Sequence, residues 1–136
     1  MLKISLYDWV IDFKWRRVMD TAELSQAFAA LCSQGKLEEA QKYWSDDVIS
    51  VEGFPSPHQV CRGREAVIAK QKMWSEGTEM HGITCEGPFI HGDQFALRFS
   101  LDCTDREGTR STMHEIALYT VKDGSVTEER FFPLMG

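Results

Sequence analysis

Hydrophobic and polar residues alternate along the second half of the chain, and turn-forming sequences interrupt the alternation at intervals. A period of two places alternate side chains on one face of a strand, so each alternating stretch predicts a β-strand. The intervening sequences are rich in Gly and Asp, which tolerate the backbone conformations of tight turns. The predicted strands are Glu79–Ile90, Gln94–Thr104, Ser111–Lys122 and Ser125–Phe132. Consecutive strands joined by short turns predict an antiparallel meander.

The first half of the chain follows a different period, with hydrophobic residues every three or four positions as in amphipathic helices. Asp20 and Glu23 have the spacing of a capping box, so a first helix is expected to begin there. Gly35 supplies the left-handed residue that closes it. A shorter second helix is expected over residues 36–44.

Between the second and third predicted helices the pattern changes again. Residues 48–52 are rich in β-branched side chains and predict a short strand. Pro55 and Pro57 then exclude ladder hydrogen bonds and predict a loop. A third helix is expected from Gly63 or Arg64 to Trp74, and its buried side is expected to carry Ala66, Val67, Ala69, Met73 and Trp74. Helices that precede an antiparallel sheet and pack against it define an α+β fold.

The N-terminal segment allows two interpretations, and we treat residues 1–18 as an extension ahead of a domain over residues 19–136. Hydrophobic residues at helical spacing between Leu2 and Phe13 are typical of a short amphipathic helix. Alternatively, Met19 directly precedes the first helix, so the natural protein could begin there. Asp8 and Asp12 interrupt the apolar run, which excludes a secretory signal.

Composition narrows the class of protein. A chain of 136 residues with 43% hydrophobic and 26% charged residues is typical of one globular domain. The net charge of −6 and the scattered Lys and Arg residues leave no basic surface for phosphates. We therefore expect neither nucleic acid nor a membrane as a partner, and a cytoplasmic location.

The cysteines and histidines do not have the spacing of metal ligands, so no metal site is expected. Cys85 and Cys103 fall on neighbouring predicted strands, where a disulfide is conceivable, but free thiols are favoured in a reducing compartment. His81, near the start of its strand, could reach a cavity mouth and transfer protons; the alternative is a partly exposed structural histidine.

Four segments of the sequence together resemble one known protein family. They are Trp44-Ser45-Asp46-Asp47-Val48-Ile49-Ser50-Val51-Glu52-Gly53, Arg62-Gly63-Arg64-Glu65-Ala66-Val67, Gly92-Asp93-Gln94-Phe95-Ala96-Leu97-Arg98-Phe99, and residues 119–132 with Lys122-Asp123-Gly124 and Glu129-Arg130-Phe131-Phe132. In order and spacing these segments resemble SnoaL-like proteins of the nuclear transport factor 2-like superfamily, which also holds ketosteroid isomerases. The likeness covers about residues 20–132.

The resemblance implies a cone-shaped α+β fold, with a strongly curved, mostly antiparallel sheet covered by about three N-terminal helices. Such a fold leaves an apolar cavity for a small apolar or aromatic molecule. The resemblance also implies a homodimer through the outer sheet face. Either of two apolar stripes could form that face, one carrying Phe95, Leu97 and Phe99 and the other carrying Ile116 and Leu118.

Strand alternation singles out Glu115 as a candidate catalytic group. Glu115 shares a strand face with Met113, Ala117, Tyr119 and Val121. A carboxylate is unusual on such an apolar face. Burial there would raise its pKa and suit it to acid–base chemistry. The alternative is that Glu115 or Glu129 forms an internal ion pair with Arg98 that holds the strands in register. Arg130 is a second possible cation across the ladder.

The resemblance also allows a comparison with the ketosteroid isomerase site, which needs a carboxylate base, a helix tyrosine and a late-strand acid. The base position falls at Gly53 and the tyrosine position at Phe28, whereas the acid position matches Glu115. Classical steroid isomerase activity is therefore not expected unless Glu52 takes the place of the base.

The sequence leaves two hypotheses of function open. The first is an isomerase, cyclase or dehydratase that needs no metal or organic cofactor, with Glu115 or Asp102 as the acid–base residue. The second is a non-catalytic module that binds a ligand or a partner protein. The residues expected to contact the ligand are Arg98, Tyr119, Glu129, His81, Glu52, Trp44, Phe54 and Trp74. Tyr119 is expected to donate a phenolic hydrogen bond, and for Trp44, Phe54 and Trp74 the alternative role is core packing.

Overall fold

The computed structural model describes residues 18–134. The extension expected at the N-terminus lies outside the described residues, apart from Val18. The helical elements are α2 (Thr21–Ser33), α3 (Leu37–Ala40), the 3₁₀ turn η1 (Gln41–Tyr43) and α4 (Arg64–Glu76). The strands are β1 (Trp44–Val51), β2 (Val60–Arg62), β3 (Glu79–His91), β4 (Gln94–Thr104), β5 (Arg110–Lys122) and β6 (Ser125–Pro133).

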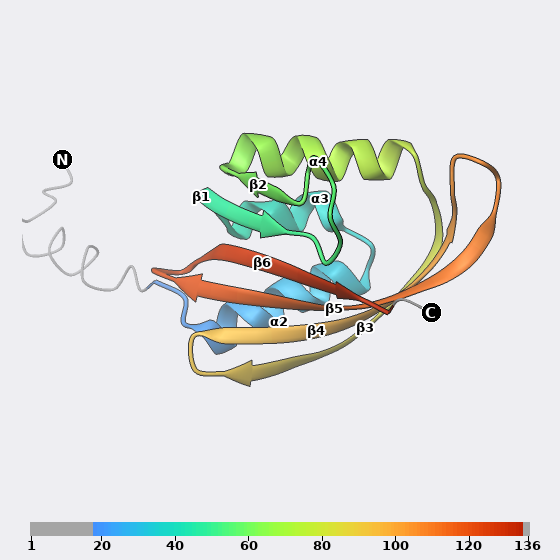
Figure 1. Cartoon of the computed structure of the whole chain (residues 1–136). Coiled ribbons are helices and arrows are strands. Elements are labelled where there is room, and N and C mark those ends of the chain that lie inside the picture. Colours follow the sequence, from blue (N-terminus) through green and yellow to red (C-terminus); the bar gives the residue numbers. More distant parts are fainter. Residues whose placement is uncertain (1–17, 135–136) are drawn as a thin grey trace, which may run out of the picture.

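The meander predicted from the alternating pattern is confirmed. β3, β4, β5 and β6 pair antiparallel in sequence order, and β1 then adds to β6 in parallel, with β2 at the edge. The complete sheet has the order β2-β1-β6-β5-β4-β3. The sheet curves, α2 runs behind β4, and α4 runs along β1 and β2 (Figure 1). The α+β fold is confirmed, with the parallel β1–β6 contact as its one non-local strand pairing.

The first helix begins as its capping sequence predicts. The Asp20 carboxylate accepts a hydrogen bond of 2.8 Å from the backbone N–H of Glu23, which satisfies one of the unpaired donors of the first turn. The helix ends before Gly35, whose φ of 73° lies in the left-handed region. Its buried side, which includes Leu24 and Phe28, packs on β3 and β4.

The second and third helices differ from the prediction. Helix α3 is shorter than expected, and Trp44 opens β1 because the strand extends to pair Trp44 with Val126 of β6. On α4 the buried side chain is Val67, while the small residue Ala66 and the flexible Met73 are exposed. Val67 and the half-buried Trp74 are on the inward side as expected, and Ile68 also packs against the core. Ala69 is exposed like Ala66, so the small residues of the expected buried side face outward.

The core lies between the helices and the concave face of the sheet. It contains the apolar side chains that point inward from β4 and β5 together with those of α2, β1 and β6, namely Phe95, Leu97, Phe99, Leu101, Ala117, Val121, Leu24, Phe28, Val48 and Val126. The alternation of β4 is therefore read correctly from the sequence. The stripe with Phe95, Leu97 and Phe99 is core, which corrects its use as a dimer face. The stripe with Ile116 and Leu118 lies on the opposite face of the sheet.

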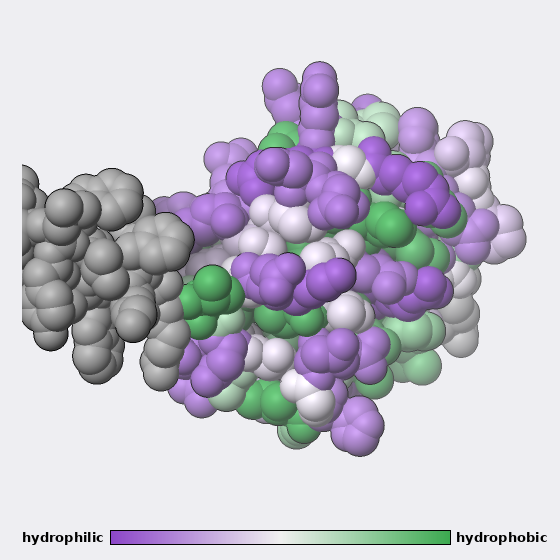
Figure 2. Space-filling view, turned by 90° about the vertical axis from the view of Figure 1, so that its left-hand side faces the viewer, coloured by the Kyte–Doolittle hydropathy of each residue, from purple (hydrophilic) through white to green (hydrophobic). Residues whose placement is uncertain are grey.

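One end of the molecule presents a mostly polar surface (Figure 2). Figure 2, which looks at the end of the molecule that lies on the left in Figure 1, shows hydrophobic side chains in small separate areas among hydrophilic ones. Among residues 18–134, no helix is long and apolar enough to cross a membrane. The cysteines are free thiols, and Cys85 pairs in register with Phe99 and not with Cys103.

Candidate active site

A chain of polar side chains starts at the end of β1 and runs to α4. The ammonium group of Lys70, on α4, donates a hydrogen bond of 2.8 Å to Oε1 of Glu52 and a second, shorter one to Oγ of Ser50. The Lys70 Nζ also lies 5.4 Å from the centroid of the Phe131 ring. Because the Ser50 side chain is fully buried, Lys70 carries its charge into the edge of the core.

The same chain continues onto β6. The parallel pairing of β1 with β6 sets Ser50 beside Glu129, and the Ser50 hydroxyl donates a hydrogen bond of 2.7 Å to Oε1 of Glu129. Glu129 is only 4% exposed. The buried indole N–H of Trp44 makes no hydrogen bond within the described residues, yet it lies near enough to Glu129 to help stabilise its ionised form. This buried carboxyl thus accepts one hydrogen bond, from Ser50, deep in the fold.

Glu115 points to the same concave face from β5. In the sheet it lies between Phe99 on β4 and Pro133 on β6, and most of its side chain is removed from solvent. Within residues 18–134, no hydrogen bond or ion pair is formed by the Glu115 carboxyl. A largely buried carboxyl without a donor has no compensation for its lost hydration, so its neutral form is favoured.

Both inner carboxyls titrate close to neutral pH. Burial, followed by the negative charges of Glu52 and Glu129, raises the pKa of Glu115 from 4.5 to about 7, against the opposing charge of Lys70. Burial likewise raises the pKa of Glu129 to about 7, although the Ser50 hydrogen bond and Lys70 favour its ionised form. A group with its pKa near the working pH can both release and accept a proton, which general acid–base catalysis requires.

Several of the predicted site residues therefore come together: Glu115, Glu129, Glu52 and Trp44. Tyr119 faces the same side but is packed in the core, with its ring 4.8 Å from both the Phe28 and the Phe95 rings. Its burial raises the pKa of Tyr119 well above the usual value. Trp74 packs against the core from the end of α4. Trp74 thus has the packing role that was its alternative, and Tyr119, predicted as a hydrogen-bond donor to a ligand, is a core residue.

Other predicted residues lie away from this group. Asp102 points to the outer face and accepts two hydrogen bonds, of 2.8 and 3.0 Å, from Arg110. Arg98 is also on the outer face, 3.6 Å from Glu86. The expected ion pair of Glu115 with Arg98 is not formed, because Glu115 pairs in register with Phe99 and the next residue along a strand faces the opposite side.

The remaining predictions are placed as follows. His81 contacts Thr104 across the β3–β4 ladder, with 2.7 Å between Nε2 and Oγ1. Phe54 is 44% exposed in the proline loop. Arg130 points outward and pairs with Glu128 at 2.6 Å, so it does not reach the inner carboxyls. These side chains are not part of the cluster around Glu115.

Ser50 and Lys70 were not among the site residues predicted from the sequence. A signal for each was present, since Ser50 alternates with Val48 and Glu52 on one strand face and Lys70 lies one turn after Val67 on α4. Neither residue stands out without its partner, however. Their significance comes from the hydrogen bonds that join them, which form only when α4 packs on β1.

The positions of the isomerase base and tyrosine are occupied by residues that cannot replace them. Gly53 lies against β6, and a Cβ atom there would come within 2.7 Å of the Phe131 carbonyl oxygen and would also collide with Pro133. Phe28 fills the tyrosine position with a ring that packs edge-on against Tyr119 and Phe95. Glu52, the one residue considered in the base's place, forms an ion pair of 2.8 Å with Lys70.

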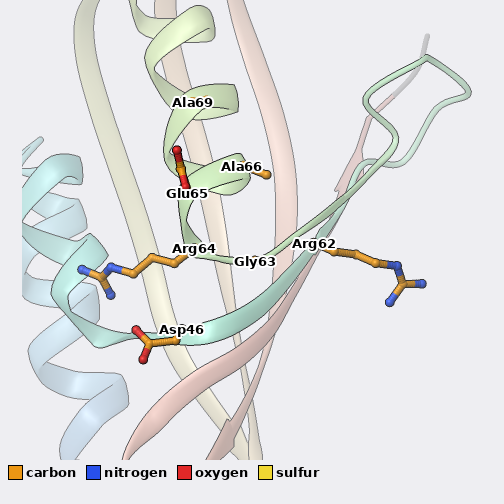
Figure 3. Close-up of a pocket in the computed structure, with 7 residues that line it drawn as sticks. All are labelled: Asp46, Arg62, Gly63, Arg64, Glu65, Ala66 and Ala69. Atoms are coloured by element: carbon orange, nitrogen blue, oxygen red, sulfur yellow. The ribbon is translucent and has the colours of Figure 1, made fainter.

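Two surface hollows lie apart from the carboxyl cluster. One, of about 610 Å³, opens at the start of α4 and is lined by Asp46, Arg62, Gly63, Arg64, Glu65, Ala66 and Ala69 (Figure 3). The Arg64 guanidinium there donates a hydrogen bond of 2.7 Å to the carbonyl oxygen of Trp44, and the Arg62 side chain points in the opposite direction from Arg64 (Figure 3). The other, of about 760 Å³, lies between α3, α4 and the start of β3 and is lined in part by Leu37, Ile68, Trp74 and Met80.

Neither hollow contains the inner carboxyls, so their size does not identify the site. We place the candidate active site at Glu115 and the Glu52–Lys70–Ser50–Glu129 chain, because buried, hydrogen-bonded titratable groups with raised pKa values gather there, which is a feature of functional sites. Within residues 18–134, no group of His, Cys, Asp and Glu side chains is arranged to hold a metal ion.

Comparison with known proteins agrees with this fold. The sequence model of the SnoaL-like domain matches residues 19–133. The chain belongs to the SnoaL-like family. A Mesorhizobium loti protein of known structure is 45% identical, covers 84% of this chain and 99% of its own, and superposes with a TM-score of 0.81. It is described provisionally as a SnoaL-like polyketide cyclase, with carbohydrate phosphatase as a second description.

More distant structures share the fold alone. A protein from Jannaschia sp. CCS1, also described provisionally as a SnoaL-like polyketide cyclase, is 18% identical with a TM-score of 0.68, over 86% of this chain and 89% of its own. A computationally designed 17-OHP binder is 22% identical with a TM-score of 0.64, over 82% of this chain and 91% of its own. No curated protein sequence matches the chain.

Proposed function

We propose that this SnoaL-like protein is an acid–base enzyme of the isomerase, cyclase or dehydratase kind. Its substrate is a small apolar or aromatic molecule with one or two polar groups, and Glu115 is the residue that exchanges a proton with it. The proposal rests on the Glu115 carboxyl, which points inward and has no hydrogen-bond partner among the described residues. Burial raises the pKa of this carboxyl to about 7.

The surroundings of Glu115 support this role. Phe99 and Pro133 flank the carboxyl with apolar surface, which suits an apolar substrate and keeps water away from the transferred proton. Lys70 provides positive charge within the same group of residues, where it can stabilise negative charge that develops on a substrate oxygen. The provisional description of the Mesorhizobium loti protein as a cyclase is consistent with such chemistry.

A generic proton-transfer assay tests the proposal without knowledge of the natural substrate. An aromatic ketone with exchangeable hydrogens beside its carbonyl is incubated with the protein in D₂O, and deuterium incorporation is followed by NMR. The change Glu115→Gln keeps the shape but removes the titrating group, and we expect the catalysed exchange to fall about 100-fold or more. The matched control is Glu128→Gln on the outer face, which should exchange at the parent rate.

A second candidate function is a non-catalytic ligand-binding module. It is favoured by the aromatic packing of the interior, where Tyr119 stacks on Phe95 and meets Phe28 edge-on. Native mass spectrometry of the purified protein distinguishes the two. A co-purified molecule that Glu115→Gln also retains, together with unchanged ketone exchange, would support binding alone and contradict the enzyme proposal.

The oligomer is part of the same proposal. On the outer face, Ile116 and Phe132 lie directly opposite each other on β5 and β6 and are 47% and 53% exposed. We infer that the surface around Ile116 and Phe132 joins two copies of the chain, since exposed apolar side chains that lie side by side on a sheet face are unfavourable in water. Ile116→Asp should convert a dimer to a monomer in light scattering after size exclusion. A monomeric parent protein would contradict the inference.

A further inference from the structure

The carboxyl of Glu129 is cut off from solvent, yet it is joined to the edge of the site by an unbroken series of hydrogen bonds. Glu129 accepts from Ser50, Ser50 accepts from Lys70, and Lys70 also donates to Glu52. Exposure increases outward, because Glu129 is 4% exposed whereas the Glu52 side chain is 23% exposed. Buried polar groups in such a chain polarise one another and can exchange protons.

We propose that Ser50 and Lys70 form a proton path between Glu52 at the edge of the site and Glu129 inside it. Glu129 is then a second proton reservoir for the site, recharged without direct contact with water. The use of this proton path in catalysis rests on the proposed function. The path itself is a property of the free protein and can be measured without any substrate.

The hydrogen-bond directions define the transfer. The Ser50 hydroxyl gives its proton to Oε1 of Glu129, and Lys70 gives an ammonium proton to Oγ of Ser50, which restores the hydroxyl. Lys70 is left as a neutral amine and takes a proton from a protonated Glu52 or from water at the edge. The net result is one proton moved from outside to Glu129, with the other groups returned to their starting forms.

Charges from every side act on this carboxyl. Lys70 faces it from α4 and Glu52 from the end of β1, while Glu115 and Tyr119 face it from β5 and Cys32 from α2. Lys70 is the one cation in that set, and its hydrogen bonds lead only to Ser50 and Glu52 among residues 18–134. Removal of either Ser50 or Lys70 therefore interrupts the chain.

The test follows the protonation of Glu129 by infrared spectroscopy after a rapid pH jump, with the carboxyl band assigned by its loss in Glu129→Gln. In Ser50→Ala, we expect protonation to slow by about tenfold or more, which corresponds to the loss of one ordinary hydrogen bond. Ser50→Thr retains a hydroxyl and should restore the rate. The matched control is Ser25→Ala, since Ser25 is equally buried but donates only to Ala22 of its own helix.

Each outcome decides the inference. Protonation of Glu129 in Ser50→Ala at the parent rate, or a Glu129 carboxyl that does not titrate between about pH 5 and pH 9, would overturn it. If Ser50→Ala does not fold, Lys70→Met interrupts the path one step further out and should slow protonation in the same way. Failure of the ketone assay with slowed protonation in Ser50→Ala would reject the proposed enzyme and keep the proton path.

Discussion

Charged residues on the two faces of the sheet differ in their ion pairing and in their exposure to water. On the outer face, Asp102 pairs with Arg110 and Arg98 with Glu86, and these side chains remain in contact with water. On the inner face, Glu115 has no partner among the described residues and Glu129 depends on Ser50. The difference shows that position on the sheet, and not residue type, sets the chemistry of a carboxyl.

The physical basis of the comparison is solvation. Hydrogen bonds from Arg110 lower the pKa of Asp102, which stays ionised, whereas burial raises the pKa of Glu115 to about 7. An exposed pair adds little to stability because water solvates both partners already. Ionisation of a buried carboxyl instead lowers the stability of the folded protein. The carboxyl therefore keeps its proton up to a pH near neutral. Variants on the two faces can test that contrast.

The largest contrast is expected in packing. Leu97→Ala, on the inner face, should lower the free energy of unfolding by about 3 kcal/mol, because it leaves a cavity in a fully buried position. Ile116→Ala, on the outer face, should cost less than about 1 kcal/mol in the monomer. Urea denaturation at equal, low protein concentration measures both. Equal losses would mean that the inner and outer faces are wrongly assigned.

The next contrast is in the pH dependence of stability. The folded pKa of Glu129 is raised to about 7, so the folded protein binds more protons than the unfolded chain between the ordinary value of 4.5 and about 7. Stability should therefore fall as the pH rises through that window, by up to about 3 kcal/mol for a fully effective group. Urea midpoints from pH 4.5 to pH 8 measure the slope.

Variants assign that slope to the inner face. Glu129→Gln and Glu115→Gln should each flatten the fall in stability, with the smaller change for Glu115 because it is partly exposed. Glu128→Gln on the outer face is the control and should leave the slope as it is. A stability that rises between pH 5 and pH 7 in the parent protein would contradict the raised pKa values.

The smallest effect is expected at Asp102. Because Arg110 lowers the pKa of Asp102, its contribution is present above the unfolded pKa and is lost as the pH falls through the folded pKa. This is the opposite sign to Glu129, in a more acidic window. Asp102→Asn should not measurably change the urea midpoint at neutral pH, and a midpoint shift as large as that of Leu97→Ala would place Asp102 in the interior instead.

Local sequence patterns were sufficient to predict most of the fold and part of the site. The alternation around Phe95, the turn at Asp123-Gly124 and the cap at Asp20 each depend on residues close in the chain, so each is readable without tertiary structure. The family resemblance added the curved sheet. Glu115 shares its strand face with apolar residues close to it in the chain, so its burial could also be predicted from local sequence.

Tertiary structure decided what surrounds that carboxyl. Ser50 and Glu129 are 79 residues apart and meet only because β1 adds to β6 in parallel, and Lys70 joins them only when α4 packs on β1. The register of β4 with β5 likewise placed Phe99, and not Arg98, beside Glu115. Alternation gives the face of a side chain within one strand, whereas its neighbours depend on pairing and packing between distant segments.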